Sequence, residues 1–522
     1  MTIDRRELLS AGAAGLGWLA AGFSASALAQ ASGHTLNIAL FPEPNGVVAG
    51  LGSTGPAQTV IGNIYDGLLR FDEKLQPMPN LATEWTVSPD MKVYTFKLKK
   101  GVTFHDGKPF TADDVVFTAD KLMRTLNPRV RVAMASVESV KALDPHTVEF
   151  RMAIPYAAFI QLFDSSTLPI APKHLYGDDV TKPLSPNPVG TGPFKFKEWQ
   201  RGSFIHLVRN EKYHESGLPK LENVYWHIIP DGASRAAAFE SGKVDVLPGG
   251  MVEFFDVGRL DKLPNTDVTL KGHEKLCPMA WMWMNHRLPL FQDLKVRKAV
   301  MHALNRDAMA KVVWQGFAKP STGAFSHQTQ FYTPQVPQYP FDTARARKLL
   351  AESSYKGQAV RLLPLPFGES WMRLAELIRQ NLTAAGFKVD LQSADLPGTI
   401  QRQSGWDFDL TLTYMFQLGD PALGVARNYV SSEIRKGSPF NNVGGYQNPK
   451  VDALFERGSR EIDPKKRAEI YADIQRTLSE DVAAAWLLDL GFPTVYRSKV
   501  DNLINTSLGL IDSLGRASIK SV

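Results

Sequence analysis

The sequence predicts a mixed α/β protein that is divided into two or three lobes. Short segments whose polarity alternates with a period of two occur along the whole chain, and this period is typical of half-buried strands. Amphipathic helices lie between these segments, which excludes an all-β fold. The chain has 522 residues, and this is too many for one core because single hydrophobic cores stop growing beyond about 250–300 residues.

The predicted strands share alternating polar and apolar side chains and are separated by turn-forming residues. They span residues 34–41, 93–98, 147–152, 194–198, 204–209, 224–229, 268–271, 279–285, 360–365, 388–392 and 408–414.

The predicted helices are marked by caps and by apolar residues at helical spacing. One begins at Thr111, because a capping box pairs this residue with Asp114 three positions later. Another spans residues 371–385 and ends at Gly386, since glycine favours the left-handed conformation that closes a helix. Residues 296–304 and 468–478 are amphipathic in the same way.

The first 31 residues have the layout of a secretory signal peptide. Arg5 and Arg6 form the charged region, residues 8–21 are mildly apolar, and the small residues at 27–29 form a cleavage site. The paired arginines resemble a twin-arginine export signal; an ordinary signal or a lipoprotein leader is the alternative. Cleavage near Ala29 or Ala31 would release a soluble chain, because no later segment has the roughly 18–20 apolar residues of a membrane span.

Charge and cysteine content exclude several classes of protein. The net charge is +6, but lysine and arginine are interleaved with acidic residues rather than clustered, which argues against nucleic acid as a partner. Cys277 is the only cysteine, so an internal disulfide is excluded, and it lies in an apolar run that predicts a core position.

No motif in the chain carries catalytic or cofactor chemistry. Residues 50–55 match the glycine pattern of dinucleotide-binding loops, but Pro42, Pro44 and Pro56 interrupt the strand and helix that this pattern requires, so we predict a loop. No two histidines lie three or four residues apart, which argues against a helical metal site. We therefore expect no enzyme activity, metal or cofactor; a secreted hydrolase stays a remote alternative because catalytic triads assemble from distant positions.

Several long motifs, in order along the chain, resemble family 5 extracellular solute-binding proteins, the peptide, oligopeptide and nickel-type receptors of ABC importers. The segment LATEWTVSPD at residues 81–90 continues through VYTFKL at 93–98 and KGVTFHDGKPFTADDVVF at 100–117. Residues 64–68, 190–194, 237–245 and 285–300 are also similar, so the resemblance covers essentially all of the chain that follows the signal peptide. The signature itself consists of turns and a capped helix, so it identifies the family and not the ligand site.

The resemblance implies a two-lobed periplasmic-binding-protein fold of type II, like cluster C, with a third, smaller domain on the first lobe. The expected boundaries are residues 32–70, 190–275 and 490–522 for lobe I, 71–189 for the smaller domain and 276–489 for lobe II. Residues 182–193, 272–278 and the segment near Leu490 are the candidate crossings between lobes.

The resemblance also implies a function. The chain is expected to capture peptides in the periplasm by closure of its lobes and to deliver them, as a monomer, to ABC permease subunits that work with cytoplasmic ATPases. Another solute, such as a nickel chelate, heme, an opine or an oligosaccharide, is the alternative. A sensory or chaperone role for the same fold is a further one.

Asp420 leads the candidate ligand-binding residues, because it lies in a Gly-Asp-Pro pattern that matches the family's amine-binding aspartate; the alternative is an Asp-Pro turn. Dipeptide-binding members hold the ligand's carboxylate with an arginine near the start of the helix at 371–385. Arg373 is the only basic residue there, and it does not match the position of that arginine clearly, which argues against a strict specificity for dipeptides. The other candidates are aromatic or polar residues near predicted strand ends, for which core packing or a solvated position is the alternative: Phe41, Glu43, Trp281, Trp283, Asn285, Trp406, Tyr414, Arg427 and Trp486.

Overall fold

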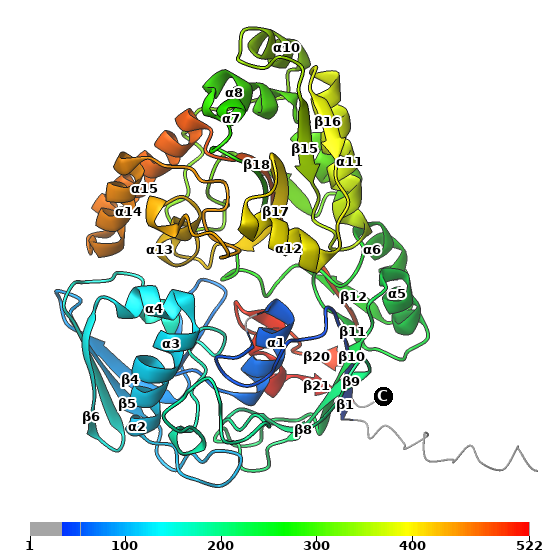
Figure 1. The fold of residues 1–522 in the computed structure, drawn as a ribbon. Helices are drawn as coiled ribbons and strands as arrows, with labels where there is room; N and C mark the ends of the chain where they lie inside the picture. Colours follow the sequence, from blue (N-terminus) through cyan, green and yellow to red (C-terminus); the bar gives the residue numbers. More distant parts are fainter. Residues whose placement is uncertain (1–33, 53, 521–522) are drawn as a thin grey trace, which may run out of the picture.

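The computed structural model describes residues 34–52 and 54–520, so the predicted signal peptide lies outside the described residues. The described chain forms two bodies that face each other across a gap between their ribbons (Figure 1). The lower body contains a seven-stranded and a four-stranded sheet, and the upper body contains a six-stranded sheet. Each sheet is accompanied by helices, as the α/β prediction requires.

The seven-stranded sheet of the lower body collects strands from distant parts of the chain, in the order β12-β19-β11-β1-β10-β9-β8. Strand β1 pairs in parallel with β10 and β11, and the other neighbours are antiparallel. The strands are β1 (Thr35–Leu40), β8 (Phe194–Gln200), β9 (Phe204–Arg209), β10 (Asn223–Ile228), β11 (Val246–Leu247), β12 (Thr266–Thr269) and β19 (Thr494–Arg497). Helices α1 (Gly55–Ile64), α5 (Gly232–Glu240) and α6 (Phe254–Leu260) belong to the same body.

The four-stranded sheet is antiparallel and has the order β4-β5-β7-β6. Its strands are β4 (Ala82–Val87), β5 (Val93–Leu98), β6 (Val137–Asp144) and β7 (Thr147–Met152), and it is accompanied by α2 (Ala112–Val116), α3 (Arg124–Leu126) and α4 (Pro128–Met134). The predicted capping box at Thr111 is confirmed, because the Thr111 amide donates to the Asp114 carboxylate at 2.9 Å. The helix then widens into a π-helical segment at Phe117–Met123.

The six-stranded sheet of the upper body has the order β14-β18-β13-β17-β15-β16. Its strands are β13 (Pro278–Met284), β14 (Ala318–Pro320), β15 (Ala359–Leu363), β16 (Lys388–Leu391), β17 (Leu410–Phe416) and β18 (Ala485–Leu490). The surrounding helices are α7 (Pro289–Gln292), α8 (Leu294–Ala303), α9 (Arg306–Ala308), α10 (Thr343–Ala351), α11 (Glu369–Ala384), α12 (Leu396–Gly405), α13 (Pro421–Gly424), α14 (Pro449–Arg460) and α15 (Pro464–Asp481). Small ribbons complete the fold: β2 (Leu69–Phe71) with β3 (Pro77–Pro79), and β20 (Val500–Asp501) with β21 (Ser518–Ile519).

Two short segments connect the seven-stranded sheet to the six-stranded sheet. Residues 270–277 lead from β12 to β13, and residues 491–493 lead from β18 to β19. The proline-rich segment at 182–193, which we expected to cross between the lobes, leads instead from the four-stranded-sheet region to β8 of the lower body. Composition alone marked it as a linker, but its two ends belong to the same body.

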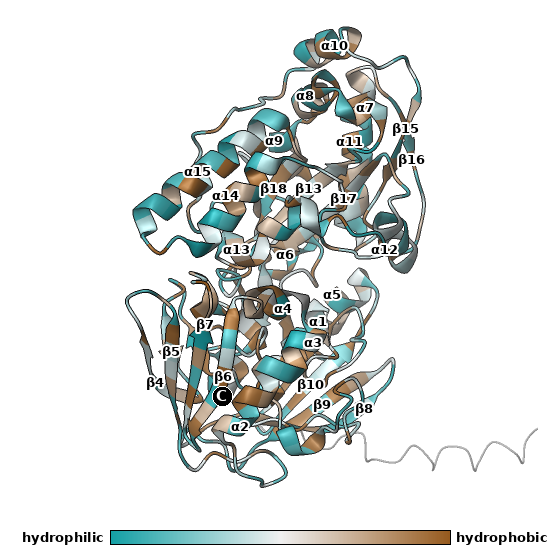
Figure 2. Ribbon diagram, turned by 60° about the vertical axis from the view of Figure 1, so that its left-hand side comes forward, coloured by the Kyte–Doolittle hydropathy of each residue, from teal (hydrophilic) through white to brown (hydrophobic). Residues whose placement is uncertain are grey.

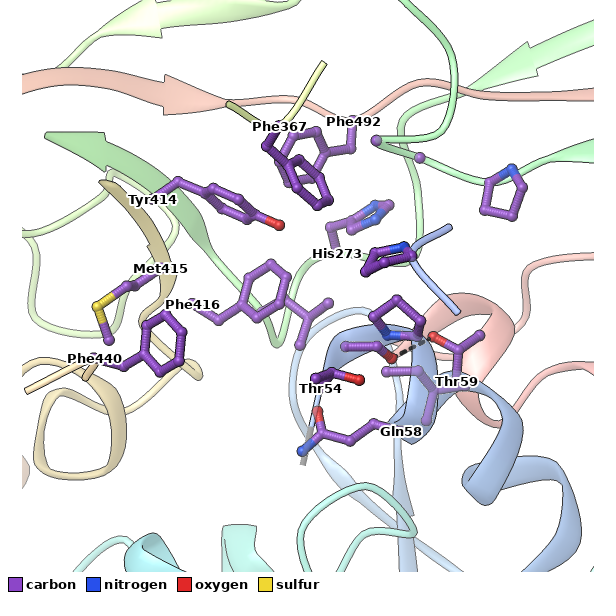
Figure 3. A pocket seen from close by; sticks show the side chains of 18 of the residues that line it. Thr54, Gln58, Thr59, His273, Phe367, Tyr414, Met415, Phe416, Phe440 and Phe492 are labelled. Carbon is purple, nitrogen blue, oxygen red and sulfur yellow. Dashed lines mark hydrogen bonds between the residues drawn. The ribbon is translucent and has the colours of Figure 1, made fainter. Parts of the chain in front are cut away.

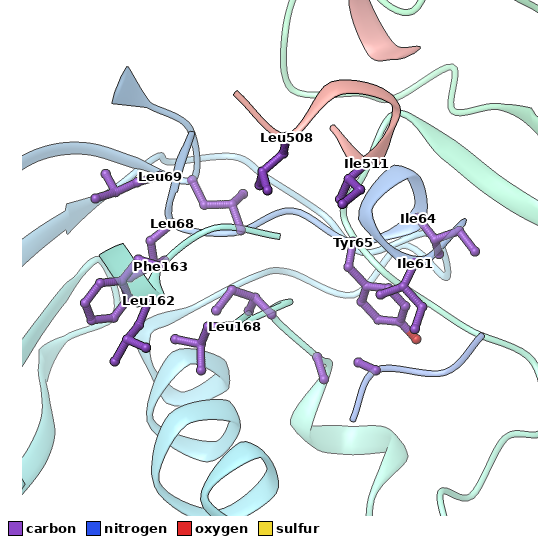
Figure 4. Packing of buried hydrophobic residues seen from close by; sticks show 14 of the residues in the cluster. Ile61, Ile64, Tyr65, Leu68, Leu69, Leu162, Phe163, Leu168, Leu508 and Ile511 are labelled. Carbon is purple, nitrogen blue, oxygen red and sulfur yellow. The ribbon is translucent and has the colours of Figure 1, made fainter. Parts of the chain in front are cut away.

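Burial follows the predicted amphipathicity. Hydrophilic residues face outward on helices such as α15 and α10, while hydrophobic residues concentrate in the sheets (Figure 2). Residues of α1 and the segment after it pack against Leu162, Phe163 and Leu168 from the smaller sheet's region and against Leu508 and Ile511 near the C-terminus (Figure 4). The two sheets of the lower body therefore share one core.

Lys275 anchors one of the two connecting segments to the lower body. It is only 2% exposed, and its Nζ donates to the Asp164 carboxylate at 2.5 Å and to the Gln161 carbonyl at 2.8 Å. Burial alone would raise the pKa of Asp164, but the ammonium of Lys275 and hydrogen bonds from Ser166 and Thr167 hold this pKa below its ordinary value. The Lys275 ammonium therefore neutralises the buried Asp164 carboxylate where the connecting segment meets the lower body.

Replacement of Lys275 by methionine is expected to lower the free energy of unfolding by about 3–5 kcal/mol, because it leaves the Asp164 carboxylate buried without its counter-charge. Urea denaturation measures the change. Lys295→Met is the matched control, since Lys295 and Glu352 form an exposed pair at 3.6 Å and such pairs contribute at most about 1 kcal/mol. Equal losses in both variants would contradict the anchoring role.

Candidate functional site

A large cleft lies between the two bodies. Its volume is about 1410 Å³, and it is lined from below by α1, the loop after β1, α4, α5 and α6, and from above by β17, α11, α12 and the segments around α13. Pockets for small molecules typically measure about 300–1,000 Å³. The space is therefore sufficient for a ligand larger than a single amino acid.

One wall of the cleft is aromatic and is centred on Tyr414 of β17 (Figure 3). Tyr414 and Phe416 lie two residues apart on one strand, so both point to the same face of the sheet. The Tyr414 ring stacks on Trp371 with centroids 5.1 Å apart, and it contacts Phe367, Phe416 and Phe492 at 5.8–6.0 Å. Phe367 in turn contacts Phe41, which follows β1 in the lower body, at 6.0 Å.

The opposite wall is small and polar. It is formed by Gly50, Gly52 and the N-terminal turn of α1, where Thr54 caps the helix and Gln58 lines the cleft. The Gln58 amide is half-buried and has no hydrogen-bond partner within residues 34–52 and 54–520. The predicted loop at 50–55 ends in this helix, whereas no strand precedes it directly, because β1 ends at Leu40. The position therefore lacks the strand that a dinucleotide-binding loop requires.

Charged groups gather at the two ends of the cleft. The end between α4 and α13 is bordered by basic residues and one carboxylate, and the end between α6 and α11 carries an excess of carboxylates. The first set is Arg131, Arg427, Glu433 and Arg435; the second is Asp231, Arg235, Glu240, Glu253, Asp256, Arg259 and Glu369. Burial, together with Glu253 and Glu369, raises the pKa of Asp256 above its ordinary value. Lys271, in the connecting segment at 270–277, also lines the cleft.

Glu253 connects the two bodies at the acidic end. Its carboxylate, at the start of α6, accepts hydrogen bonds from the Glu369 amide at 3.2 Å, the Ser370 amide at 3.1 Å and the Ser370 hydroxyl at 2.7 Å. These donors form the first turn of α11, where a negative charge is favoured by the helix dipole. A side chain at Gly368 would meet Glu253 at 2.7 Å, and its φ of 93° also favours glycine.

At the opposite end the bodies touch again. The Tyr156 hydroxyl donates to the Ala422 carbonyl at 3.2 Å, and the Ala157 amide donates to the Ser459 carbonyl at 2.9 Å. The cleft is therefore bridged on both sides of its aromatic centre.

Three of the predicted site residues line this cleft: Phe41, Tyr414 and Arg427. Burial raises the pKa of the Tyr414 hydroxyl to about 12, so the group is neutral at physiological pH, and it has no hydrogen-bond partner in the described part of the chain. It is therefore free to donate to or accept from a ligand.

The predicted tryptophans on β13 and β18 are core residues. Trp281 is 0% exposed, Trp283 is 2% exposed and Trp486 is 1% exposed. Trp486 Nε1 donates to the Tyr429 hydroxyl at 2.8 Å. Strands β13 and β18 lie inside the sheet and are buried on both faces, so these side chains occupy the core-packing position that was the alternative interpretation of the sequence and do not line the cleft.

The remaining polar candidates hold local structure. Asn285 donates to the Phe408 carbonyl at 3.0 Å, and Trp406 closes α12 in the left-handed conformation beneath the Arg287 guanidinium. Glu43 accepts from Trp199 Nε1 at 3.0 Å and pairs with Arg201, which places it against the β8–β9 hairpin. Arg373 is exposed on α11 and pairs with Glu369 one turn earlier at 2.5 Å. None of these four residues lines the cleft.

The structure corrects the role expected for Asp420. Both carboxylate oxygens accept from Arg467 of α15, at 2.7 and 2.8 Å, and the Ala422 amide donates to one of them at 2.9 Å. The side chain is 1% exposed. Burial opposes the charge on Arg467, but the Asp420 carboxylate outweighs this effect and raises the arginine's pKa. The aspartate is therefore already paired, and an incoming ammonium group would have to displace a bidentate guanidinium.

Sequence reasoning missed Gln58, Phe367, Trp371, Phe416 and Phe492. The alternation in β17 was a usable signal for Phe416, because it shares a face with Tyr414. Phe492 falls within the predicted crossing near Leu490, where a side chain between the lobes is expected to meet the cleft. Nothing in the sequence marked Gln58.

Two lobes, two connecting segments and a cleft lined by both lobes define a ligand-binding protein of the periplasmic-binding-protein fold, type II. The model of bacterial extracellular solute-binding proteins, family 5, matches residues 76–436, and the chain belongs to this family.

Curated relatives and solved structures are similar to the chain over most of its length. The glutathione-binding protein GsiB of Pectobacterium atrosepticum is 28% identical over 440 residues, which cover 83% of each chain. The periplasmic binding protein DppA of Helicobacter pylori, solved with the peptide STSA, superposes with a TM-score of 0.82 at 26% identity, over 93% of this chain and 98% of that one. NikZ of Campylobacter jejuni, solved with Ni(L-His), has a TM-score of 0.81 at 23% identity, over 93% and 100% of the chains.

Within the described residues, no helix is both long and apolar enough to span a bilayer, and no three or more histidine, cysteine or acidic side chains cluster as metal ligands.

The pairing of Asp420 with Arg467 predicts a structural phenotype. Arg467→Met is expected to lower the free energy of unfolding by about 3–5 kcal/mol, because Asp420 then remains buried without a counter-charge. Chemical denaturation measures the change. The control is Arg460→Met on α14, whose partner Glu456 is exposed, so its effect should stay below about 1 kcal/mol. A loss in Arg467→Met no larger than in the control would show that the pair carries little stability.

Glu253 is expected to favour contact between the lobes. Glu253→Ala removes three hydrogen bonds to a charged acceptor, each of a kind worth about 1.5–3 kcal/mol before solvation of the freed groups. Small-angle X-ray scattering of the unliganded protein should then give a larger radius of gyration. Asp261→Ala, at the exposed end of α6, is the control and should leave the radius unchanged. An unchanged radius in Glu253→Ala would contradict this role.

Proposed function

We propose that this protein is the substrate-binding subunit of an ABC importer and that it captures peptides or closely related solutes between its lobes. The observation that carries the proposal is the cleft itself: a space of about 1410 Å³ with an aromatic wall facing a small polar wall, and with most of its charged residues toward its ends. Peptides combine apolar side chains, amide groups and terminal charges, and they match this distribution. The glutathione-binding relative and the peptide-bound neighbour support the same class of ligand.

Closure of the lobes is the proposed mechanism of capture. Within the described residues, only the segments at 270–277 and 491–493 join the two bodies along the chain, so rotation about them opens or closes the cleft. Closure removes water from the ligand and requires each buried polar group to find a partner. The Gln58 amide and the Tyr414 hydroxyl are placed to supply such partners to the ligand's amide groups.

Capture of the ligand's amine is not assigned to Asp420 in this proposal. Its carboxylate is fully engaged by Arg467 and the Ala422 amide. The ligand's amine instead stays near the cleft mouth, where it needs no buried counter-charge.

The partners follow from the proposed role. We propose delivery to ABC permease subunits that work with cytoplasmic ATPases, a periplasmic location after removal of residues 1–31, a monomeric state and binding without turnover. Capture of a nickel chelate or an opine is the second candidate, favoured by the structural similarity to NikZ and to an agropinic-acid-binding protein.

Thermal denaturation with pooled tripeptides to pentapeptides tests the proposal. Ligand at about 100 times its dissociation constant adds roughly 2.7 kcal/mol to stability, which raises the melting temperature. We expect a rise with free peptides and also with N-acetylated peptides, because Asp420 is already paired. A rise that acetylation abolishes would restore an amine-binding role for a cleft carboxylate. No rise with either pool would reject peptides and favour the second candidate.

A further inference from the structure

The centre of the cleft presents a group of aromatic rings, four of which stay partly exposed. Phe41, Phe367, Tyr414 and Phe416 are all partly exposed where they line the cleft, although each packs on a neighbouring ring. Phe492 completes the group from the connecting segment at 491–493. Aromatic surface that stays open within a cleft marks a place where a partner binds.

The rings form a receptacle rather than a flat patch. Phe416 and Phe492 both stand nearly perpendicular to Tyr414, at 80° and 79°, while Phe367 is inclined at 46°. The Tyr414 hydroxyl points into the space that these rings surround, toward His273, and α1 with Thr54 and Gln58 lies beyond (Figure 3). Perpendicular and offset rings are the geometries that aromatic groups prefer, so a further ring fits among them favourably.

A charged group of the cleft reaches this receptacle at one side: the Arg235 guanidinium lies 5.2 Å from the Phe41 ring centroid and donates to the Met251, Ile229 and Pro230 carbonyls. His273 is a further titratable neighbour besides Tyr414, and its ring lies 5.7 Å from Phe492. Burial lowers the pKa of His273 to about 4, so the imidazole is neutral at physiological pH. A lysine side chain placed here would lose its hydration without gaining a counter-charge, and the Arg235 guanidinium would repel it.

We infer that the five-ring subsite formed by Phe41, Phe367, Tyr414, Phe416 and Phe492 selects an aromatic or similarly bulky apolar side chain of the ligand, with the Tyr414 hydroxyl hydrogen-bonded to an adjacent ligand amide. The inference rests on the proposed function and narrows its ligands to peptides that carry such a residue. Because most of the cleft's charged residues lie toward its ends, the preferred residue lies inside the peptide and not at a terminus.

The experiment measures, by isothermal titration, the dissociation constants of three tetrapeptide pools for the protein. The pools differ at one inner position, which holds phenylalanine, alanine or lysine. Burial of a phenylalanine side chain corresponds to roughly a 10- to 100-fold lower dissociation constant. We expect the phenylalanine pool to bind 10- to 100-fold more tightly than the alanine pool, and the lysine pool to bind no better than alanine. Equal binding of the phenylalanine and alanine pools overturns the inference and leaves the proposed function standing.

Two variants test whether the five-ring subsite causes the preference for phenylalanine. Phe416→Leu should reduce the ratio between the phenylalanine and alanine pools several-fold, and Tyr414→Phe should weaken both pools equally because it removes only the hydroxyl. Phe341→Leu, on the exposed surface of the upper body, is the matched control and should keep the ratio of the unsubstituted protein. An unchanged ratio in Phe416→Leu overturns the assignment.

If no peptide pool binds, the proposed function is rejected, and the subsite is then tested separately. N-acetyl-phenylalaninamide and N-acetyl-alaninamide then test the subsite alone, because they carry the side chain and the amides without a peptide's charged ends. Tighter binding of the phenylalanine compound supports the subsite, and equal binding overturns it.

Discussion

The lobes are joined by two short segments, and the buried pairing of Lys275 with Asp164 fixes one of them to the lower body. Every other feature of the site depends on this arrangement. The connecting segments also supply part of the cleft wall, since His273 lies in one and Phe492 in the other, with their rings 5.7 Å apart. Residues of the connecting segments therefore contribute both to the junction between the lobes and to the wall of the cleft.

The distribution of charge in the cleft follows from which elements meet there. Sheet strands β17 and β1 bring apolar side chains to the centre, because alternate residues of a strand face the same side. Helix ends and loops surround them and bring charged residues to the two ends of the cleft, where solvent still reaches. The result is an aromatic middle with most of the charged residues toward the two ends, a pattern that suits an extended ligand better than a compact ion.

Asp420 lies in the family's Gly-Asp-Pro sequence pattern but does not have the ligand-binding role that this pattern predicted. A carboxylate that is 1% exposed needs a counter-charge, and Arg467 provides one with two parallel hydrogen bonds. The Gly-Asp-Pro pattern is local, whereas the arginine comes from a helix that follows much later in the chain. The same holds for Glu43, whose expected place at the cleft edge is overridden by hydrogen bonds from the β8–β9 hairpin.

The sequence by itself determined the class of fold, the position of most strands and helices, and the family. Alternation with period two located β5, β7 and β17, a capping box located the start of α2, and Gly386 marked the end of α11. These features are local, because hydrogen bonding and side-chain direction within a few residues decide them. The motifs at residues 81–117, which are also local features of the sequence, identified the family.

Only the tertiary structure decided which side chains face the cleft. Trp281, Trp283 and Tyr414 all lie on strands of one sheet and look alike in sequence, yet the first two are buried and the third opens into the space between the lobes. The difference arises because β13 is covered on both faces, while the part of β17 that carries Tyr414 lies opposite the other lobe. Burial is a property of what packs against a strand, and residues distant in the chain supply that packing.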